Sequence, residues 1–243
     1  MAASANPVVA RSRPILIGIV GDSGSGKTTL TNEIAALIGP ERSLCLCLDD
    51  YHRYDRAARR RLGITALAPE CNRLDLMAEQ LLALRDGKSV VKPVYDHATG
   101  LFAPDEVVSP RETVIARGLL GLHTDLLARC YDVSVFLDPD PELRIRWKIA
   151  RDCALRGYSP DGVRAQILHR RADAERYIIP QRARADVVVG FYPAPASNGD
   201  GPLLMRAEQR PGAPGDLAGL ILAAAERARH IRGFCHAGPA STT

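Results

Sequence analysis

Residues 14–28 constrain the fold more than any other part of this chain. The continuous apolar run PILIGIV at 14–20 leads directly into the glycine-rich segment GDSGSGKT at 21–28. An apolar run without alternation is typical of a strand that is buried on both faces. The glycine-rich segment fits the pattern G-x-x-x-x-G-K-[ST], and residues 28–38 after it have helical spacing. The order of strand, loop and helix predicts a P-loop, whose backbone N–H groups surround a polyphosphate.

The residues of this P-loop have expected tasks. Lys27 is predicted to reach the β- and γ-phosphates, and the hydroxyl of Thr28 to hold Mg²⁺. A glycine-rich turn that matches by chance is the alternative, and the flanking strand and helix argue against it. We therefore expect ATP and Mg²⁺ as ligands, with these residues at the nucleotide: Gly21, Asp22, Ser23, Gly24, Ser25, Gly26, Lys27, Thr28 and Thr29.

The rest of the chain alternates predicted strands with predicted helices. Apolar runs predict strands over 43–48, 113–116, 131–137 and 187–189. Helical spacing predicts helices over 75–85, 141–156, 160–176 and 216–232, the first with Asp75 as its N-cap. Such alternation predicts an α/β fold of the P-loop NTPase type, with a mostly parallel sheet and helices on both faces.

Composition excludes several classes of protein. The formal net charge is only +4, which does not by itself call for nucleic acid. No apolar run approaches the roughly 20 residues of a membrane-spanning helix. The six cysteines form no CxxC pair, which argues against a zinc ribbon and favours reduced thiols. We expect a cytoplasmic protein without a membrane or nucleic-acid partner.

Two carboxylates, Asp49 and Asp50, end the second predicted strand. Ligands of open parallel sheets bind beyond the carboxyl ends of the strands, so these side chains are expected to face the P-loop. One of them could accept a proton from an attacking hydroxyl, whereas the alternative is a polar turn. Five arginines follow these carboxylates: Arg53, Arg56, Arg59, Arg60 and Arg61. They could form an anion site or a solvated helix face, and a nucleic-acid-binding patch is the least favoured alternative.

Two further segments carry candidate site residues. A stripe in the predicted helix 141–156 could stabilise charge on a transferring phosphoryl group, or could be a surface row of ion pairs. Its members recur every four residues and share one face: Arg144, Lys148, Asp152 and Arg156. In the segment KPVYDHATG at 92–100, His97 could bind a sugar or phosphate from an extended loop, or be merely exposed.

Together these motifs resemble the phosphoribulokinases of plants and cyanobacteria and their bacterial relatives, within the phosphoribulokinase and uridine kinase family. The resemblance covers about residues 15–191, through GDSGSGKTT, CLDDYHRYDR, KPVYDHATG and WKIARDCALRGYSP. Uridine kinase shares the P-loop and a related Tyr-Asp loop, but not DDYHRYDR or RDCALRGYSP. The resemblance implies phosphorylation of the C1 hydroxyl of D-ribulose 5-phosphate by ATP, giving D-ribulose 1,5-bisphosphate and ADP in the Calvin cycle.

The resemblance also assigns roles to individual residues. Asp50 matches the family's proposed catalytic base, and Asp49 joins Thr28 at the metal. Lys27, Lys148 and Asp152 are implied as further catalytic residues. The implied substrate-binding residues are His52, Arg56, Tyr95, His97, Arg151 and Arg156. The implied partner is a small pentose phosphate, and the assembly is left open, with a homodimer among the expectations.

Three departures from the family pattern bear on function. Arg117-Gly118 stands where the family usually has Glu-Gly, whose acid helps hold the metal. Ser25 replaces the regulatory P-loop Cys of the plant branch, so Cys47, which matches its partner, cannot form that disulfide. The longer C-terminal part of the relatives is expected to be replaced by a Pro/Gly-rich tail. Two alternatives therefore stay open: a uridine kinase-like or other sugar or nucleoside kinase, and a nucleotide-binding relative with little catalysis.

These observations predict three regions along the chain. An N-terminal tail is expected over residues 1–13, and a P-loop kinase domain over 14–192. Residues 193–243 are expected to form a linker rich in Pro and Gly with a C-terminal helix or tail.

Overall fold

The computed structural model describes residues 13–194, 203–213, 215–219 and 221–223. Its main sheet has six strands in the order β2-β5-β1-β6-β7-β8, parallel except for the antiparallel pair β7–β8. The P-loop strand β1 is therefore central, as its continuous apolar run predicts. The strands are β1 (Ile15–Gly21), β2 (Ser43–Cys47), β5 (Thr113–Gly118), β6 (Val133–Leu137), β7 (Val187–Pro193) and β8 (Leu203–Gln209).

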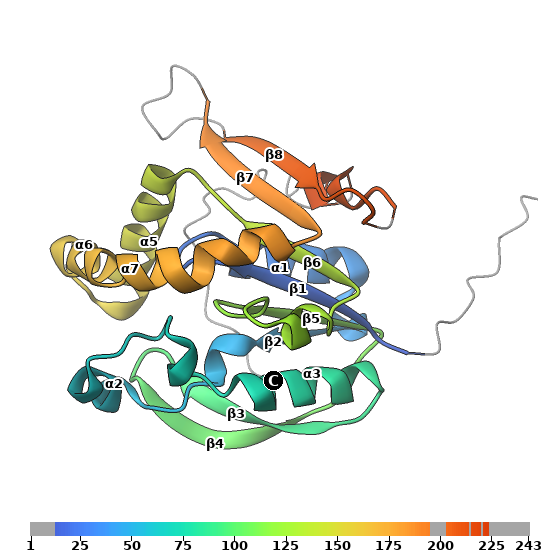
Figure 1. Cartoon of the computed structure of the whole chain (residues 1–243), viewed down its shortest axis with the longest axis horizontal. Helices are drawn as coiled ribbons and strands as arrows, with labels where there is room; N and C mark the ends of the chain where they lie inside the picture. The colour runs from blue at the N-terminus through green and yellow to red at the C-terminus, as the bar shows by residue number, and fades with distance from the viewer. Residues whose placement is uncertain (1–12, 195–202, 214, 220, 224–243) are drawn as a thin grey trace, which may run out of the picture.

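Helices cover both faces of this sheet, so the predicted fold class is confirmed (Figure 1). Leu30 of α1 and Leu143 of α5 pack on one face with Ile19 of β1. Leu81 of α3 and Leu127 of α4 pack on the other. The helices are α1 (Lys27–Ile38), α2 (Arg56–Leu62), α3 (Leu74–Arg85), α4 (Asp125–Ala128), α5 (Pro141–Arg156), α6 (Pro160–His169) and α7 (Arg171–Asp173).

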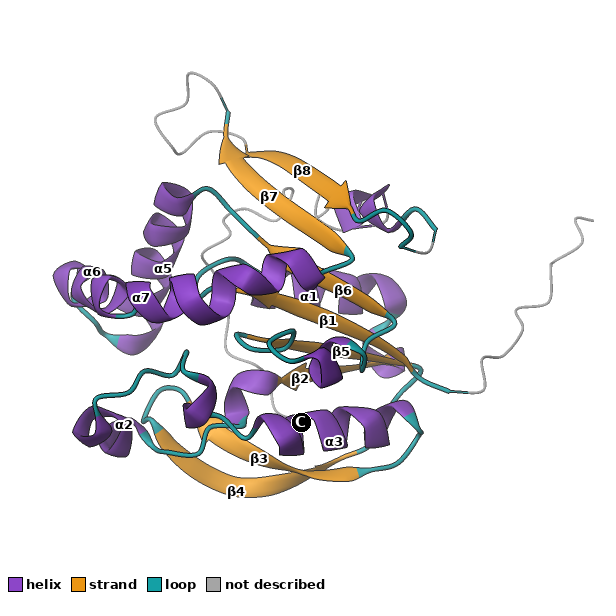
Figure 2. Cartoon of the chain, viewed as in Figure 1, coloured by secondary structure: helices purple, strands orange, loops and turns teal. Residues whose placement is uncertain are grey.

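A separate antiparallel hairpin lies beyond α3, at the bottom of Figure 2. Its strands are β3 (Val90–Asp96) and β4 (Leu101–Val108). Val90 and Val108 pack with α3 residues in the same cluster that holds the sheet residue Leu16. His97, expected on an extended loop, lies in the short turn 97–100, while residues 92–96 before it belong to β3. This hairpin carries His97 to the carboxyl end of β2.

Several predicted details need correction. Helix α3 begins at Leu74 with Arg73 as its N-cap, so Asp75 lies in the first turn, where the helix dipole still favours a carboxylate. The predicted helix 160–176 breaks after His169 into α7 and one turn of π-helix. Residues 203–209, expected within a linker, form strand β8 because they pair with β7.

Other predictions concern the ends of the chain. Within the predicted helix 216–232, residues 217–219 and 221–223 are helical and residue 216 is not. The other residues of that prediction lie outside the described part of the chain. The predicted N-terminal tail also lies outside them, except for Arg13. Within the described ranges, no helix is both long enough and apolar enough to span a bilayer.

Candidate active site

The P-loop joins the end of β1 to the start of α1. The ammonium group of Lys27 is buried and donates hydrogen bonds to the carbonyls of Gly21 at 2.7 Å and Asp22 at 2.9 Å. Burial lowers its pKa to about 8, while Asp49 and Asp22 oppose the shift. The buried hydroxyl of Ser25 has no hydrogen-bond partner among the described residues, and a phosphate oxygen would supply one. These residues therefore fit a bound polyphosphate.

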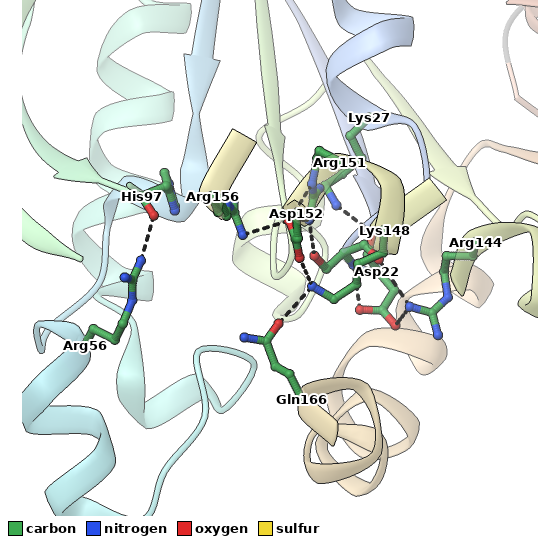
Figure 3. Close-up of polar contacts among 11 residues, drawn as sticks. Asp22, Lys27, Arg56, His97, Arg144, Lys148, Arg151, Asp152, Arg156 and Gln166 are labelled. Carbon is green, nitrogen blue, oxygen red and sulfur yellow. Dashed lines mark hydrogen bonds and ion pairs between the residues drawn. The ribbon is translucent and has the colours of Figure 1, made fainter. Parts of the chain in front are cut away.

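Helix α5 packs directly against this loop. Gly24 has φ +86°, and a Cβ atom there would lie 2.7 Å from Cβ of Lys148, so a larger residue would push the loop and helix apart. Arg144 forms an ion pair with Asp22 at 2.8 Å (Figure 3). Arg151 donates a hydrogen bond to the hydroxyl of Ser23 at 3.1 Å. The predicted stripe and the P-loop are thus parts of one site.

Asp152 is the centre of the stripe. Its carboxylate is 0% exposed and pairs with Lys148 at 2.6 Å, Arg151 at 2.9 Å and Arg156 at 3.2 Å (Figure 3). Burial alone would raise the pKa of Asp152, but the three cations lower it. Burial also lowers the pKa of Lys148 to about 8, although Asp152 opposes this. The alternative of a solvated row of ion pairs is therefore wrong for Lys148 and Asp152.

Asp50 follows β2, at the same edge of the sheet as the P-loop after β1, and lies between two cations from the hairpin. Its Oδ2 atom is 2.5 Å from Nζ of Lys92, and its Oδ1 atom is 3.5 Å from Nε2 of His97. Burial would raise the pKa of Asp50, but hydrogen bonds from His97 and Lys92 lower it overall. Despite burial, Asp50 and Cys47 raise the pKa of His97 to about 9. Asp50 is therefore ionised at neutral pH.

Asp49 and Asp50 have different neighbours although they are adjacent in sequence. Oδ1 of Asp49 accepts the backbone N–H of Leu119 at 2.8 Å, and its charge opposes the fall in the pKa of Lys27 that burial causes. Its carboxylate and the exposed hydroxyl of Thr28 offer hard oxygen ligands, which fit Mg²⁺. Half-buried Arg117 lies on β5 beside Ile19 of β1, and its charge adds to the lowering of the Lys27 pKa that burial mainly causes.

Three predicted substrate residues make mainly protein contacts. His52 is 2% exposed, and its Nδ1 atom lies 2.7 Å from the side-chain oxygen of Asn72. Burial lowers its pKa to about 4, so its ring is neutral at pH 7. The hydroxyl of Tyr95 accepts a hydrogen bond from Arg59, and Arg56 donates to the backbone carbonyl of His97 at 2.6 Å. Their direct contact with substrate stays a prediction.

A basic cavity of about 670 Å³ opens between α2 and α6. Arg56, Arg59, Arg60 and Arg170 line it, together with Gln166, which accepts a hydrogen bond from Lys148 at 2.8 Å. Burial lowers the pKa of Arg170. The cations of Arg59 and Arg156 add to this lowering, whereas the carboxylates of Asp22 and Asp152 oppose it. The cavity therefore fits the phosphate group of a ligand.

Sequence reasoning missed Arg170 and Lys92 as site residues. Lys92 is one of only four lysines and lies within the quoted segment KPVYDHATG, which was a usable signal. Arg170 lies after α6 in a region that offers no motif, so only the folded cavity reveals it.

Comparison with known proteins gives independent evidence on the family and the fold. Residues 16–196 match the Phosphoribulokinase / Uridine kinase family. The chain is 44% identical over 181 residues to "Phosphoribulokinase" of Synechocystis sp., covering 74% of this chain and 54% of that protein. It is 34% identical over 179 residues to "Uridine kinase" of Staphylococcus aureus, covering 72% and 86%. The chain thus spans about half the length of the phosphoribulokinase relative.

Solved structures show the same fold. The phosphoribulokinase from Rhodobacter spheroides superposes with a TM-score of 0.62 at 20% identity, covering 82% of this chain and 81% of that one.

Proposed function

Because the chain belongs to the phosphoribulokinase / uridine kinase family, we propose that it transfers the γ-phosphoryl group of ATP to the C1 hydroxyl of D-ribulose 5-phosphate. The products are D-ribulose 1,5-bisphosphate and ADP. The observation that carries the proposal is ionised Asp50, which lies between Lys92 and His97 at the sheet edge that also carries the P-loop, with the Asp152 helix packed on that loop. That arrangement supplies a base, a phosphate cradle and fixed cations, as phosphoryl transfer requires.

The P-loop holds the nucleotide in this proposal. Backbone N–H groups from Asp22 to Thr28 and the ammonium of Lys27 bind the phosphates, so Lys27 exchanges its bonds to the loop carbonyls for bonds to phosphate. Thr28 and Asp49 would hold Mg²⁺, which offsets negative charge on the phosphates when bound.

Asp50 acts as the general base. It accepts the proton of the C1 hydroxyl as the oxygen attacks the γ-phosphorus, and the bond to the β-phosphate oxygen breaks. The cations of Lys92 and His97 keep the carboxylate ionised and fix its direction. Lys148 and Arg151 lie on the P-loop side, where they stabilise charge on the group in transfer.

Cations on α2 and near α6 select a phosphorylated sugar. Arg56 and Arg170 line the basic cavity, and Arg156 forms an ion pair with Asp152. A dianionic 5-phosphate in this cavity would pair with these half-buried guanidinium groups. A nucleoside such as uridine carries no phosphate and leaves them uncompensated, which favours the sugar phosphate over the uridine kinase alternative.

The test is ADP release with Mg-ATP over a panel of ribulose 5-phosphate, ribose 5-phosphate and uridine. We expect kcat/KM to be highest for ribulose 5-phosphate, with Lys27→Ala inactive as the blank. Faster turnover of uridine would favour the uridine kinase-like alternative. Binding of ATP without turnover of any acceptor would favour a nucleotide-binding relative with little catalysis, the alternative raised by Arg117.

A further inference from the structure

A cluster of three potential metal ligands lies at the edge of the candidate active site. Cys47, Asp50 and His97 place a thiol, a carboxylate oxygen and an imidazole nitrogen within 4.8 Å of one another, the one such group in the described part of the chain. Cys47 ends β2, Asp50 follows it in a short 3₁₀ helix, and His97 comes from the hairpin turn. The fold brings these donors together from segments about 50 residues apart.

The donor set selects a particular class of cation. Zn²⁺ binds Cys sulfur, His nitrogen and Asp oxygen at about 2.0–2.3 Å, so ligand atoms of a tetrahedral site lie roughly 3.3–3.8 Å apart. Shifts of about 1 Å by the three side chains would therefore complete the coordination. Mg²⁺ prefers oxygen ligands alone, whereas a thiolate and an imidazole favour a softer ion such as Zn²⁺.

The surroundings support a ligand role for Asp50. Its Oδ2 atom is anchored by Lys92 at 2.5 Å, while Oδ1 faces His97 at 3.5 Å. Carboxylates that bind metals are commonly oriented by such a partner on their other oxygen. Lys92 also pairs with Glu106 at 3.1 Å, which offsets its positive charge. The side chain of His97 is 38% exposed, so an ion can enter from solvent.

We propose that Cys47, Asp50 and His97 form an inhibitory Zn²⁺ site, with water as the fourth ligand. Binding releases the thiol proton of Cys47 and occupies an oxygen of Asp50. A coordinated carboxylate cannot accept the proton of the sugar hydroxyl, so turnover stops. The binding stands on the geometry alone, whereas the inhibition rests on the proposed function.

Cobalt substitution tests the binding directly. The full chain, reduced and freed of metal with a chelator, is titrated with Co²⁺ while the near-ultraviolet and visible absorption is recorded. We expect one bound Co²⁺ with a thiolate-to-cobalt charge-transfer band, which Zn²⁺ abolishes. Cys47→Ser should lose the band. Cys45→Ser, which removes the exposed thiol two residues earlier on β2, should keep it. No band in the wild type, or an equal band in Cys47→Ser, overturns the site.

Kinase assays test the inhibition separately. With Mg-ATP and ribulose 5-phosphate, buffered free Zn²⁺ should inhibit the wild type and Cys45→Ser, but leave Cys47→Ser unaffected. Equal inhibition of Cys47→Ser would contradict the inhibitory role. If no variant turns over ribulose 5-phosphate while the cobalt band depends on Cys47, the proposed function fails and the metal site stands.

Discussion

The ammonium group of Lys92 lies 2.5 Å from a carboxylate oxygen of Asp50, and both groups are buried. The two residues are 42 positions apart in the chain and meet because the hairpin β3–β4 packs beside the end of β2. In the proposed reaction this pair does two things. It keeps Asp50 ionised, and it directs one carboxylate oxygen toward the site.

Lys92→Met tests this pairing through the pH dependence of kcat. The cation lowers the pKa of Asp50, so its removal should raise that pKa. The protonated acid cannot act as a base, and activity should therefore be lost at a higher pH than in the wild type as the pH falls. Rates from about pH 4 to 8 test this, since the wild type should show no fall from Asp50 there, whereas Lys92→Met should lose activity toward the acid end. Lys88→Met, at an exposed lysine before β3, is the control and should leave the profile unchanged. An unshifted profile in Lys92→Met would show that Lys92 does not tune the base.

Asp50→Asn should lower kcat by about 10²–10⁴-fold and change the KM for the sugar phosphate little. The amide keeps the shape of the side chain but cannot take a proton. Asp49→Asn is the comparison, and its main effect should be a higher Mg²⁺ requirement because Asp49 is the proposed carboxylate ligand of the metal. A greater loss of kcat in Asp49→Asn than in Asp50→Asn would exchange the two roles.

Asp152→Asn should destabilise the fold as well as the site. Breaking a buried ion pair commonly costs about 3–5 kcal/mol, and this carboxylate compensates three cations. Urea denaturation followed by circular dichroism measures the free energy of unfolding. Asp138→Asn removes a half-exposed partner of Arg182 and should cost at most about 1 kcal/mol. Similar losses in the two variants would contradict the central place given to Asp152.

Arg117→Glu should lower the Mg²⁺ concentration needed for half-maximal rate and raise kcat. Arg117 lies on β5 beside Ile19 of the P-loop strand, and a carboxylate there would attract a dication instead of repelling it. Rates across a range of Mg²⁺ concentrations measure the effect. Arg111→Glu is the control, because it makes the same change of charge just before the first residue of β5, away from the P-loop end of that strand. It should leave both quantities unchanged. If Arg117→Glu leaves both quantities unchanged or destroys activity, Arg117 does not occupy the place of the family's metal acid.

Local sequence signals predicted the elements that carry the phosphate site. The strand before Gly21, the P-loop and the helix 141–156 follow from apolar periodicity and from residue types that each structure requires. These patterns involve only neighbouring residues, so they can be recognised without knowing how the chain packs. The motif residues Lys27, Asp50 and Asp152 could therefore be named in advance, although their partners could not.

Contacts between distant segments were the part that sequence could not predict. Strands β4 and β8 lie at sheet edges and keep many side chains exposed, so their sequences show no clear apolar pattern. Their register depends on the strand with which each one pairs. The burial of His52 against Asn72 also depends on packing. From sequence alone, a histidine after a strand is as consistent with ligand binding as with burial in the core. Lys92 reaches Asp50 only after the hairpin has folded over α3.

The measurement that tests the central proposal most directly is the identity of the product. Mg-ATP, D-ribulose 5-phosphate and the full chain are followed by ³¹P nuclear magnetic resonance. The proposal predicts a second phosphomonoester signal, split into a triplet by the two C1 protons, that grows in step with ADP. Lys27→Ala should give neither signal. ADP without a new sugar phosphate, a phosphate on another carbon, or transfer to uridine but not to ribulose 5-phosphate would contradict it.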